Sequence, residues 1–520
     1  MMKTLRSILM PLLGLLFFTC APRIIERFPS NDLGKYAKDV ILDPGQAVSD
    51  WGIYAVNLTT GKTLIEYNAD KLFLPASNTK LYTTSAALNL LGSDYRYQTH
   101  ILATGPIRDG VLEGDLVILG HGDPTWSARF YEDDPTFVFR GWADSLKARG
   151  ITAISGDIVG VDAVFDDFPL GSGWIWGYES YYYSAQVAGL SFNENTLDFT
   201  IESGLVGEPP IIIPSPVTAY VEIENNLVTL DTLALLDSLG LLDALGLRES
   251  LSERDTVAWP DTLEFPGFDW DFIRVQGTNR IVFTGHFPAD DTVEYGASVE
   301  NPVLYTASVL LETLLAENIK VRGTGKSQYL YQDGNTTVLP SGDTLFVYHS
   351  PPLDDIVYYL NKDSQNFMAE NLLRTMGTLT GRGGSGWRGR RMAKPVWAAM
   401  GVDTNTTYLT DGSGLSSYNR ITPRNTTNLL IHMRADSAFV QSLPIAGIDG
   451  TIKNMMKGTA AEGRVFAKTG TLRHARALSG YAHNHKGDWI VFSILVNDYL
   501  TPLREVNDKI TRICELLVLQ

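Results

Sequence analysis

Alternating and clustered apolar positions predict a β-hairpin and a helix near the beginning of the chain. Polar and apolar side chains alternate over residues 51–67 around a Thr-Thr-Gly turn, which is typical of two paired strands. Apolar residues then recur from Pro75 and Ala76 to Leu91. Because proline is favoured in the first turn of a helix, this second stretch predicts a helix.

Short apolar runs separated by turn residues dominate the middle of the chain, from about residue 97 to 341. Runs such as 114–119 and 156–161 predict strands. Within this region, residues 229–251 are rich in Leu and Asp and nearly repeat themselves. We interpret that stretch as a solvated helical excursion, with a partner-binding surface as the alternative.

Mixed helical and strand-like patterns return toward the C-terminus. Residues 352–378 predict helix. Three consecutive strands are predicted further along, over residues 464–472, 477–483 and 489–497. The chain ends in an amphipathic pattern that predicts a helix with Thr501 as its N-cap and Pro502 in its first turn.

Together these patterns predict an α/β (α+β) protein with a discontinuous domain. Residues 46–96 and 342–520 share the mixed texture, so we expect them to fold together. Residues 97–341 are expected to form inserted β-rich subdomains, including an acidic, Leu-rich excursion near 225–270. Residues 21–45 are expected to be a stalk and leading segment.

The first residues of the chain have the pattern of an export signal. A short basic segment precedes an apolar run over residues 8–18, which is too short to span a bilayer and is typical of a secretory signal peptide over residues 1–20. We therefore expect an exported protein of the periplasm or cell envelope. Cys20 closes the run, and it is either a chance cysteine or a lipidated residue that anchors the protein to a membrane.

Composition argues against several classes of function. A net charge of −17 over 520 residues disfavours nucleic-acid binding, which needs clustered basic residues. Two cysteines, Cys20 and Cys514, are too few for a disulfide framework or an iron–sulfur centre within one chain, and Cys514 is expected to be buried in the last helix. We interpret His483 and His485 as a hairpin tip, and the Arg/Gly-rich residues 381–389 as a mobile surface loop without P-loop spacing. No metal or other cofactor is expected.

Ser77 and Lys80 form the one S-x-x-K sequence of the chain, at the beginning of the predicted helix. Residues three apart share a helix face, so the hydroxyl and the amine can meet. A hydroxyl becomes a nucleophile when a base takes its proton, and lysine is such a base when burial or a nearby cation lowers its pKa. Taken alone, the motif is a weak signal, and an ordinary helix start is the favoured alternative.

A second serine and an asparagine are expected beside such a pair, to relay protons and to hold a substrate amide. S-x-N occurs three times, with its asparagine at positions 193, 366 and 419. Asn193 and Asn419 lie in turn-rich segments. Ser364 precedes a helical pattern, so we select Ser364 and Asn366, with a cap or a turn as the alternative.

The sequence Lys468-Thr469-Gly470-Thr471 lies in the first of the three C-terminal strands, and K-T-G occurs once. A lysine there can hold a substrate carboxylate and lower the pKa of Lys80. Gly470 has no side chain, so a peptide can approach the strand and pair with its backbone. The alternative is a strand followed by a glycine turn.

In this order, the three motifs resemble those of the penicillin-binding and serine β-lactamase superfamily. Over roughly residues 45–515 the chain is similar to class C low-molecular-mass penicillin-binding proteins, the D-Ala-D-Ala carboxypeptidase/endopeptidases. The wide separation of Ser77 and Ser364 suits the large insertion of that family. The similar segments are residues 121–125, 173–176, 181–182, 193–195, 411–416, 418–423 and 443–451.

The resemblance implies an antiparallel sheet flanked by helices and a serine-type hydrolase. Ser77 would be the acylated nucleophile and Lys80 its general base. Ser364 would relay a proton to the leaving amine, and Asn366 would hold Lys80 and the substrate amide. The expected substrates are peptidoglycan stem peptides and their cross-links, with β-lactam antibiotics as covalent inhibitors.

The resemblance also assigns the strand motif and exposes one departure from the family. Lys468 and Thr469 would bind the terminal carboxylate, and the backbone N–H groups of Ser77 and Thr471 would form the oxyanion hole. The family has an Asp in the Trp-rich segment that contacts the amino end of the diaminopimelate side chain. This chain has a tyrosine there, at position 178, with Glu179 adjacent. Either Glu179 substitutes for the Asp after a one-residue shift, or the side-chain preference is altered. The alternatives are a β-lactamase or esterase on the same fold and a non-catalytic wall-binding protein.

Overall fold

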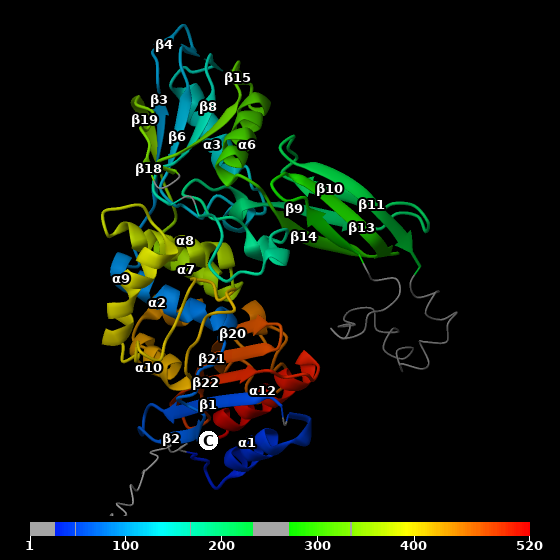
Figure 1. The fold of residues 1–520 in the computed structure, drawn as a ribbon, viewed down its shortest axis with the longest axis vertical. Coiled ribbons are helices and arrows are strands. Elements are labelled where there is room, and N and C mark those ends of the chain that lie inside the picture. The colour runs from blue at the N-terminus through cyan, green and yellow to red at the C-terminus, as the bar shows by residue number, and fades with distance from the viewer. Residues whose placement is uncertain (1–25, 47, 167, 232–269, 333–334) are drawn as a thin grey trace, which may run out of the picture.

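The protein is described by a computed structural model that covers residues 26–46, 48–166, 168–231, 270–332 and 335–520. The predicted signal peptide, Cys20 and most of the Leu/Asp-rich stretch lie outside these ranges. The described chain forms three bodies, of which two lie one above the other and the third projects to the side (Figure 1). Within these ranges, every helix is too short or too polar to cross a membrane.

A five-stranded sheet with the order β2-β1-β22-β21-β20 forms the first body. It combines strands from both ends of the chain, and all four pairings are antiparallel. The predicted hairpin and the three predicted C-terminal strands are thereby confirmed. The strands are β1 (Asp50–Asn57), β2 (Thr63–Tyr67), β20 (Val465–Leu472), β21 (Ala475–His483) and β22 (Trp489–Asn497).

Two terminal helices, α1 (Asp32–Leu42) and α12 (Leu503–Val518), share a hydrophobic cluster with one face of this sheet. The stretch expected to be a stalk therefore contains a packed helix. The N-cap of α12 is Pro502 rather than the predicted Thr501, whose hydroxyl instead accepts a hydrogen bond from Gln46 Nε2 at 3.2 Å. Cys514 is buried within α12, as predicted.

The other face of the sheet carries a layer of helices and a second hydrophobic cluster. The predicted helical region 352–378 breaks at Ser364, whose φ of +60° lies in the left-handed region. The Arg/Gly-rich residues are not a surface loop throughout, because Ser385 caps a helix that begins at Gly386. The helices are α2 (Thr79–Leu91), α7 (Leu353–Lys362), α8 (Asn366–Thr378), α9 (Gly386–Ala399), α10 (Pro423–Met433) and α11 (Ser437–Ser442).

The second body contains a five-stranded sheet with the order β16-β8-β6-β3-β19, covered by α3 (Phe137–Ala148) and α6 (Pro302–Ala316). Strand β19 pairs with β3, so the change of body lies after His349 and not at the expected residue 342. The strands are β3 (Gln98–Ala103), β6 (Leu116–Gly120), β8 (Ile158–Asp162), β16 (Gly325–Tyr329) and β19 (Asp343–His349).

Two small sheets extend this body. One has the order β15-β7-β5-β4, and the other pairs β17 with β18. Their strands are β4 (Ile107–Arg108), β5 (Val111–Leu112), β7 (Ala153–Ile154), β15 (Lys320–Val321), β17 (Tyr331–Gln332) and β18 (Asn335–Thr336).

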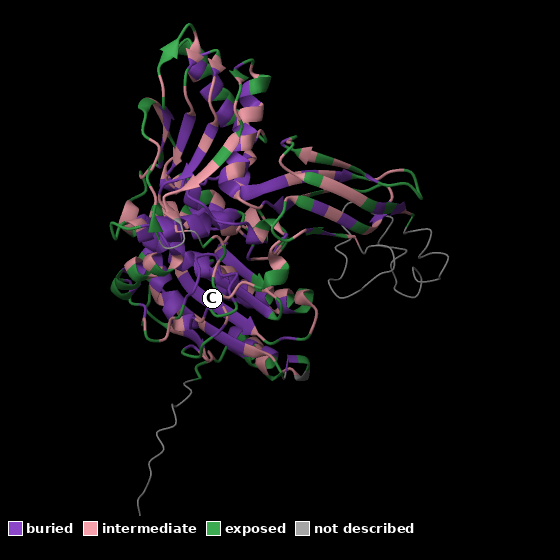
Figure 2. Cartoon of the chain, turned by 45° about the horizontal axis from the view of Figure 1, so that its top comes forward, coloured by how far each residue is buried: buried purple, intermediate pink, exposed green. Residues whose placement is uncertain are grey.

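The third body consists of two three-stranded sheets that project to the side in Figure 1. It is less buried than the other two, as Figure 2 shows by its many exposed and intermediate residues. The predicted helical excursion begins inside strand β11, so its first residues are extended. The strands are β9 (Thr196–Glu202), β10 (Ile211–Ser215) and β14 (Thr292–Ser298) in one sheet, and β11 (Glu222–Leu230), β12 (Asp271–Arg274) and β13 (Arg280–Pro288) in the other.

Candidate active site

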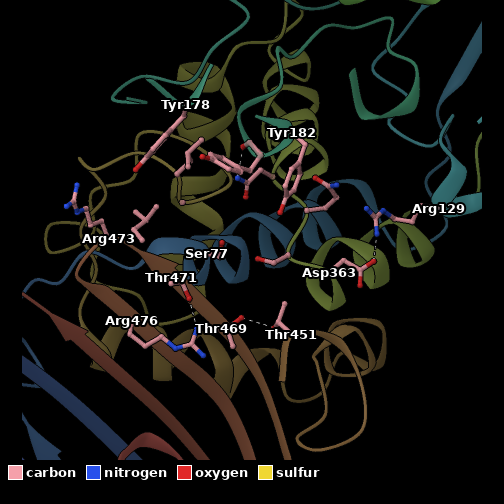
Figure 3. A pocket seen from close by; sticks show the side chains of 17 residues that line it. Ser77, Arg129, Tyr178, Tyr182, Asp363, Thr451, Thr469, Thr471, Arg473 and Arg476 are labelled. Atoms are coloured by element: carbon pink, nitrogen blue, oxygen red, sulfur yellow. Dashed lines mark hydrogen bonds and ion pairs between the residues drawn. The ribbon is translucent and has the colours of Figure 1, made fainter. Parts of the chain in front are cut away.

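A cleft of about 610 Å³ lies where the helical layer, edge strand β20 and the inserted segment meet (Figure 3). Residues from all three predicted motifs reach it. The lining residues are Ser77, Arg129, Tyr178, Tyr182, Tyr183, Asp363, Ser364, Gln365, Asn366, Gly414, Leu415, Thr451, Thr469, Thr471, Leu472, Arg473 and Arg476.

Ser77 is presented by a tight 3₁₀ turn, Ala76–Asn78, that leads directly into α2. The preceding residue, Ala76, has a φ of +46°, which is unusual for a residue with a side chain. Gly414 makes this conformation possible, because a Cβ at Gly414 would lie only 1.9 Å from the Ala76 carbonyl oxygen. The backbone around Ser77 is therefore held in a strained conformation by a neighbouring glycine turn.

Lys80 lies one turn further along and is fully buried. Its Nζ lies 2.9 Å from Ser77 Oγ, 2.6 Å from Asn366 Oδ1 and 2.7 Å from the Ser413 carbonyl oxygen. An amide oxygen and a carbonyl oxygen can only accept hydrogen bonds. They therefore take the two N–H groups of a neutral amine and leave its lone pair for the Ser77 hydroxyl.

Burial lowers the pKa of Lys80 to about 7. The negative charges of Asp411 and Glu370 oppose this shift without reversing it. We predicted a contribution from Lys468, but desolvation is the dominant cause. Glu370, itself buried beside Asp411, has its pKa raised to about 7 and accepts hydrogen bonds from the backbone N–H groups of Gly412 and Ser413.

Ser364 and Lys468 form a second hydroxyl–amine pair beside the cleft. Lys468 Nζ donates to Ser364 Oγ at 2.8 Å and to the Thr469 carbonyl oxygen at 3.1 Å. Burial, together with the charges of Lys80 and Arg476, holds the pKa of Lys468 well below its usual range. The left-handed conformation of Ser364 turns its side chain between α7 and α8.

Of the three S-x-N segments, Ser364–Asn366 is the one that contacts Lys80. Asn366 also donates from Nδ2 to the Tyr183 carbonyl oxygen at 2.7 Å. Asn193 bonds within its own turn to Thr196 and to Asp198. Asn419 instead ties together the Asp411 turn, through bonds to Asp411 and to the Thr410 backbone.

The K-T-G segment lies on edge strand β20, directly against the turn that carries Ser77. A Cβ at Gly470 would lie 2.5 Å from the Pro75 carbonyl oxygen and 3.0 Å from Ser77 N. The glycine therefore allows β20 to approach the Ser77 backbone, a reason that differs from the predicted approach of a peptide. Thr469 and Thr471 line the cleft, and the hydroxyls of Thr469 and Thr451 lie 2.8 Å apart.

Three arginines line the cleft, Arg129, Arg473 and Arg476, and none of them followed from the sequence motifs. Arg476 lies on β21 opposite Thr471 and donates a hydrogen bond to its hydroxyl. Its signal was a charged residue within an apolar strand. Arg129 bonds Glu194 at 2.7 Å and Asp363 at 2.5 Å, and so links the inserted segment to the turn that carries Ser364 (Figure 3). No local pattern around Arg129 predicted this contact.

In the structure, the Trp-rich segment contributes a tyrosine to the cleft where the resembled family has an Asp. Tyr178 lines the cleft. Glu179 does not substitute for the family's Asp there, because it forms an ion pair with Arg274 at 3.1 Å outside the cleft lining. The part of the cleft near Tyr178 is therefore aromatic where relatives of the resembled family have a carboxylate.

The described residues contain no group of three or more His, Cys, Asp or Glu side chains arranged to hold a metal ion. His483 ends β21, and its ring lies against Trp489 at the beginning of β22, with ring centroids 4.9 Å apart. The interpretation of this segment as a hairpin tip is confirmed.

The sequence model of a family described as D-Ala-D-Ala carboxypeptidase 3 (S13) matches residues 34–234 and 270–516. A D-alanyl-D-alanine carboxypeptidase of Actinomadura sp. is 30% identical, over 95% of this chain and 86% of its own length. The D-alanyl-D-alanine carboxypeptidase DacB of Haemophilus influenzae is 26% identical, over 87% of this chain and 86% of its own length.

Solved structures show the same fold. The crystal structure of penicillin binding protein 4 (dacB) from Haemophilus influenzae has a TM-score of 0.73 and 23% identity, with 94% of this chain and 98% of that chain covered. A structure of the same protein in complex with a β-lactam has a TM-score of 0.68 and 22% identity, with the same coverage. The predicted penicillin-binding fold, with an antiparallel sheet flanked by helices, is confirmed.

Proposed function

The chain belongs to the D-Ala-D-Ala carboxypeptidase 3 (S13) family, and on that premise we propose that it hydrolyses the D-Ala-D-Ala end of peptidoglycan stem peptides, or their cross-links, through an acyl-enzyme. One observation carries the proposal. The buried Lys80 amine contacts the Ser77 hydroxyl and Asn366 Oδ1 at once. A serine hydroxyl beside a buried amine of lowered pKa is an activated nucleophile.

In the proposed first step, Ser77 Oγ attacks the carbonyl carbon of the penultimate D-Ala. Lys80 Nζ takes the hydroxyl proton, since a pKa of about 7 leaves a large fraction of the amine neutral at neutral pH. The tetrahedral oxyanion is stabilised by the backbone N–H groups of Ser77 and Thr471. Gly470 supports this geometry, because it lets the two backbones approach closely.

The C–N bond breaks in the proposed second step, and the leaving D-Ala amine needs a proton. Ser364 supplies it and is reprotonated through its hydrogen bond with Lys468. Asn366 keeps Lys80 in place and is positioned at the cleft to hold the substrate amide. Water then attacks the Ser77 ester and gives a proton to Lys468 through Ser364, while Lys80 returns its proton to Ser77 Oγ. The shortened peptide leaves, and the hydroxyl and both amines are restored.

A β-lactam would follow the same first step with a different outcome. Ser77 opens the four-membered ring, and the leaving nitrogen stays attached to the acyl group. The acyl-enzyme is therefore expected to persist, so the protein should bind penicillin covalently. Thr469 and Thr471, which line the cleft, are expected to contact the carboxylate of either ligand.

We also propose that the two parts of the chain have different roles. Residues 46–96 and 342–520 carry the catalytic machinery, with the upper boundary moved to follow His349 because β19 pairs within the insertion. The inserted residues 97–341 cover the cleft and supply Arg129 and Tyr178 to it. Export to the cell envelope fits the proposed wall substrate, and lipidation of Cys20 stays a prediction.

The test is covalent labelling by a fluorescent penicillin. Wild-type protein should take up one label and release D-Ala from a stem pentapeptide, whereas Ser77→Ala should do neither. A wild type that remains unlabelled and releases no D-Ala contradicts the proposal. Label on Ser77→Ala would overturn the residue assignment, and rapid turnover of a cephalosporin would instead support a β-lactamase.

A further inference from the structure

Arg476 is a buried cation without a carboxylate partner at the wall of the cleft. Its exposed fraction is 6%. The guanidinium donates to Thr471 Oγ1, to Asn507 Oδ1 at 2.8 Å and to Met455 Sδ at 3.2 Å. No Asp or Glu among the residues covered by the structure forms an ion pair with it.

This arrangement is costly for the unliganded protein. Buried charges in proteins are normally paired, because an unpaired one loses its hydration without compensation. Three of the five guanidinium N–H groups have a described partner, which leaves two for another group. Burial lowers the pKa of Arg476 to about 10, so the side chain keeps its charge at neutral pH. These facts indicate that an anion from outside completes the site.

Lys468 is the cation that the family resemblance assigns to the substrate carboxylate, but its geometry suits another task. Its Nζ is directed to Ser364 Oγ and the Thr469 carbonyl oxygen. The side chain is fully buried and lies behind the residues that line the cleft. With its pKa held well below the usual range, it is a weaker source of positive charge than Arg476.

The bond from Arg476 also fixes the direction of the Thr471 hydroxyl. A hydroxyl has one proton and two lone pairs. Because Thr471 Oγ1 accepts from the guanidinium, its own proton remains available to a ligand in the cleft. Thr469, two positions earlier on β20, presents a second hydroxyl to the same cleft (Figure 3).

We propose that Arg476 is the cation that binds the terminal carboxylate of the substrate, together with the hydroxyls of Thr469 and Thr471, while Lys468 serves proton transfer through Ser364. The inference deepens the proposed D-Ala-D-Ala peptidase function and rests on it. It makes Arg476 a specificity-determining residue, because the ion pair forms only with a ligand that has an anionic group at this position.

The experiment compares two peptides that differ only in charge, one ending in D-Ala-D-Ala and one in D-Ala-D-alaninamide. For Arg476→Gln, kcat/KM for the acid should fall about 10–100-fold, the usual range for loss of a charge-assisted hydrogen bond. The value for the amide should fall less than about threefold, because that ligand has no carboxylate to lose. Arg476→Lys should recover part of the loss. Arg391→Gln, an exposed arginine of α9, is the control.

A second measurement separates binding from a structural role. Since Arg476 is unpaired, Arg476→Gln is expected to keep or raise the Tm. Acylation by benzylpenicillin should slow in that variant, and acylation by its methyl ester should not. Should Arg476→Gln fail to fold, Thr471→Val is measured with the same two peptides and should show the same preferential loss on the acid.

Three outcomes are distinct. Equal losses on the acid and the amide, or full activity on both, would overturn the role of Arg476. A large fall in Tm with parallel losses on both peptides would reassign it to structure. A wild type that releases D-Ala-type products from neither peptide would instead contradict the proposed function itself.

Discussion

Buried cations are paired in one region of the molecule and unpaired in another. Around the inserted segment, Arg274 forms ion pairs with two glutamates and Arg374 forms one with an aspartate. At and behind the wall of the cleft, three basic side chains bond mainly to hydroxyls, amides and carbonyl oxygens, and these are Lys80, Lys468 and Arg476.

The difference separates residues that hold the fold from residues that serve chemistry. A paired buried cation links two elements, and losing it leaves a carboxylate uncompensated. An unpaired one costs folding free energy, but its lowered pKa and free hydrogen-bonding capacity are available to a substrate. The charges also act on each other, because Lys80 and Arg476 both contribute to the low pKa of Lys468.

The largest effect is expected from Lys80→Met. Removing the base should slow acylation by penicillin about 10²–10⁴-fold, the usual contribution of general-base catalysis. The Tm should stay unchanged or rise, because a buried amine is replaced by an apolar side chain of similar length. Stopped-flow acylation and thermal unfolding measure the two effects.

Lys362→Met is the matched control for this comparison. Lys362 is also a buried lysine, but its Nζ lies 2.7 Å from Asp449 Oδ2. Its loss should lower the Tm and leave acylation much less affected than Lys80→Met does. If Lys80→Met destabilised the protein as strongly as Lys362→Met, the distinction between the two kinds of cation would fail.

The next largest effect is expected on stability, from Arg274→Gln. Arg274 is 3% exposed and bonds Glu179 at 3.1 Å and Glu300 at 3.0 Å. Leaving both carboxylates without their cation should cost about 3 kcal/mol of unfolding free energy. Urea denaturation of Arg274→Gln beside Arg476→Gln gives the comparison, and similar losses in both variants would contradict it.

The pH dependence of acylation tests whether Lys80 is the titrating base. Lys80 acts as a neutral base, so acylation should fall about tenfold per pH unit below its pKa of about 7 and level off above it. Asp411→Asn removes the negative charge that most raises the pKa of Lys80, so the acidic limb should move to lower pH. A limb that stays in place or moves to higher pH would argue against Lys80 as the titrating base.

The smallest of these effects is expected from Arg129→Gln. Arg129 connects Glu194 of the insertion to Asp363 beside the proton-relay serine. Loosening that turn should reduce kcat about tenfold, which corresponds to about 1.4 kcal/mol in the barrier. Arg140→Gln removes a comparable arginine paired with Asp134 away from the cleft. Equal kinetics in the two variants would show that the contact does not position the turn.

Much of the site was predictable from local sequence because its motifs are short and each element is strongly patterned. The strands around Gly470 and the helix after Ser77 follow from spacing alone. Arg476 also left a local signal, since it is a charge between the buried residues Ala475 and Ala477 of a strand. Arg129 left none, because its partners lie 65 and 234 positions further along the chain.

Helices α9 and α1 were not predicted, because each depends on packing against another helix that local sequence does not show. The glycines near residue 385 predict a mobile loop, but a Cβ at Gly389 would lie 1.8 Å from the Leu373 carbonyl oxygen. Glycine there permits α9 to pack closely on α8. Helix α1 was not predicted, although Leu33, Tyr36, Ala37 and Val40 recur at helical spacing, and its partner α12 lies at the other end of the chain.

The order of strands in the first sheet has a consequence for how the protein is made. Strand β1 ends at Asn57, but its neighbour β22 begins at Trp489, so synthesis must nearly finish before the two can join. Until then the early hairpin has an open edge, which invites pairing with other chains. Such distant contacts also slow folding. We therefore expect the nascent chain to need a chaperone that covers this edge. A late stop codon that removes β22 should prevent the sheet from forming, although few residues are lost.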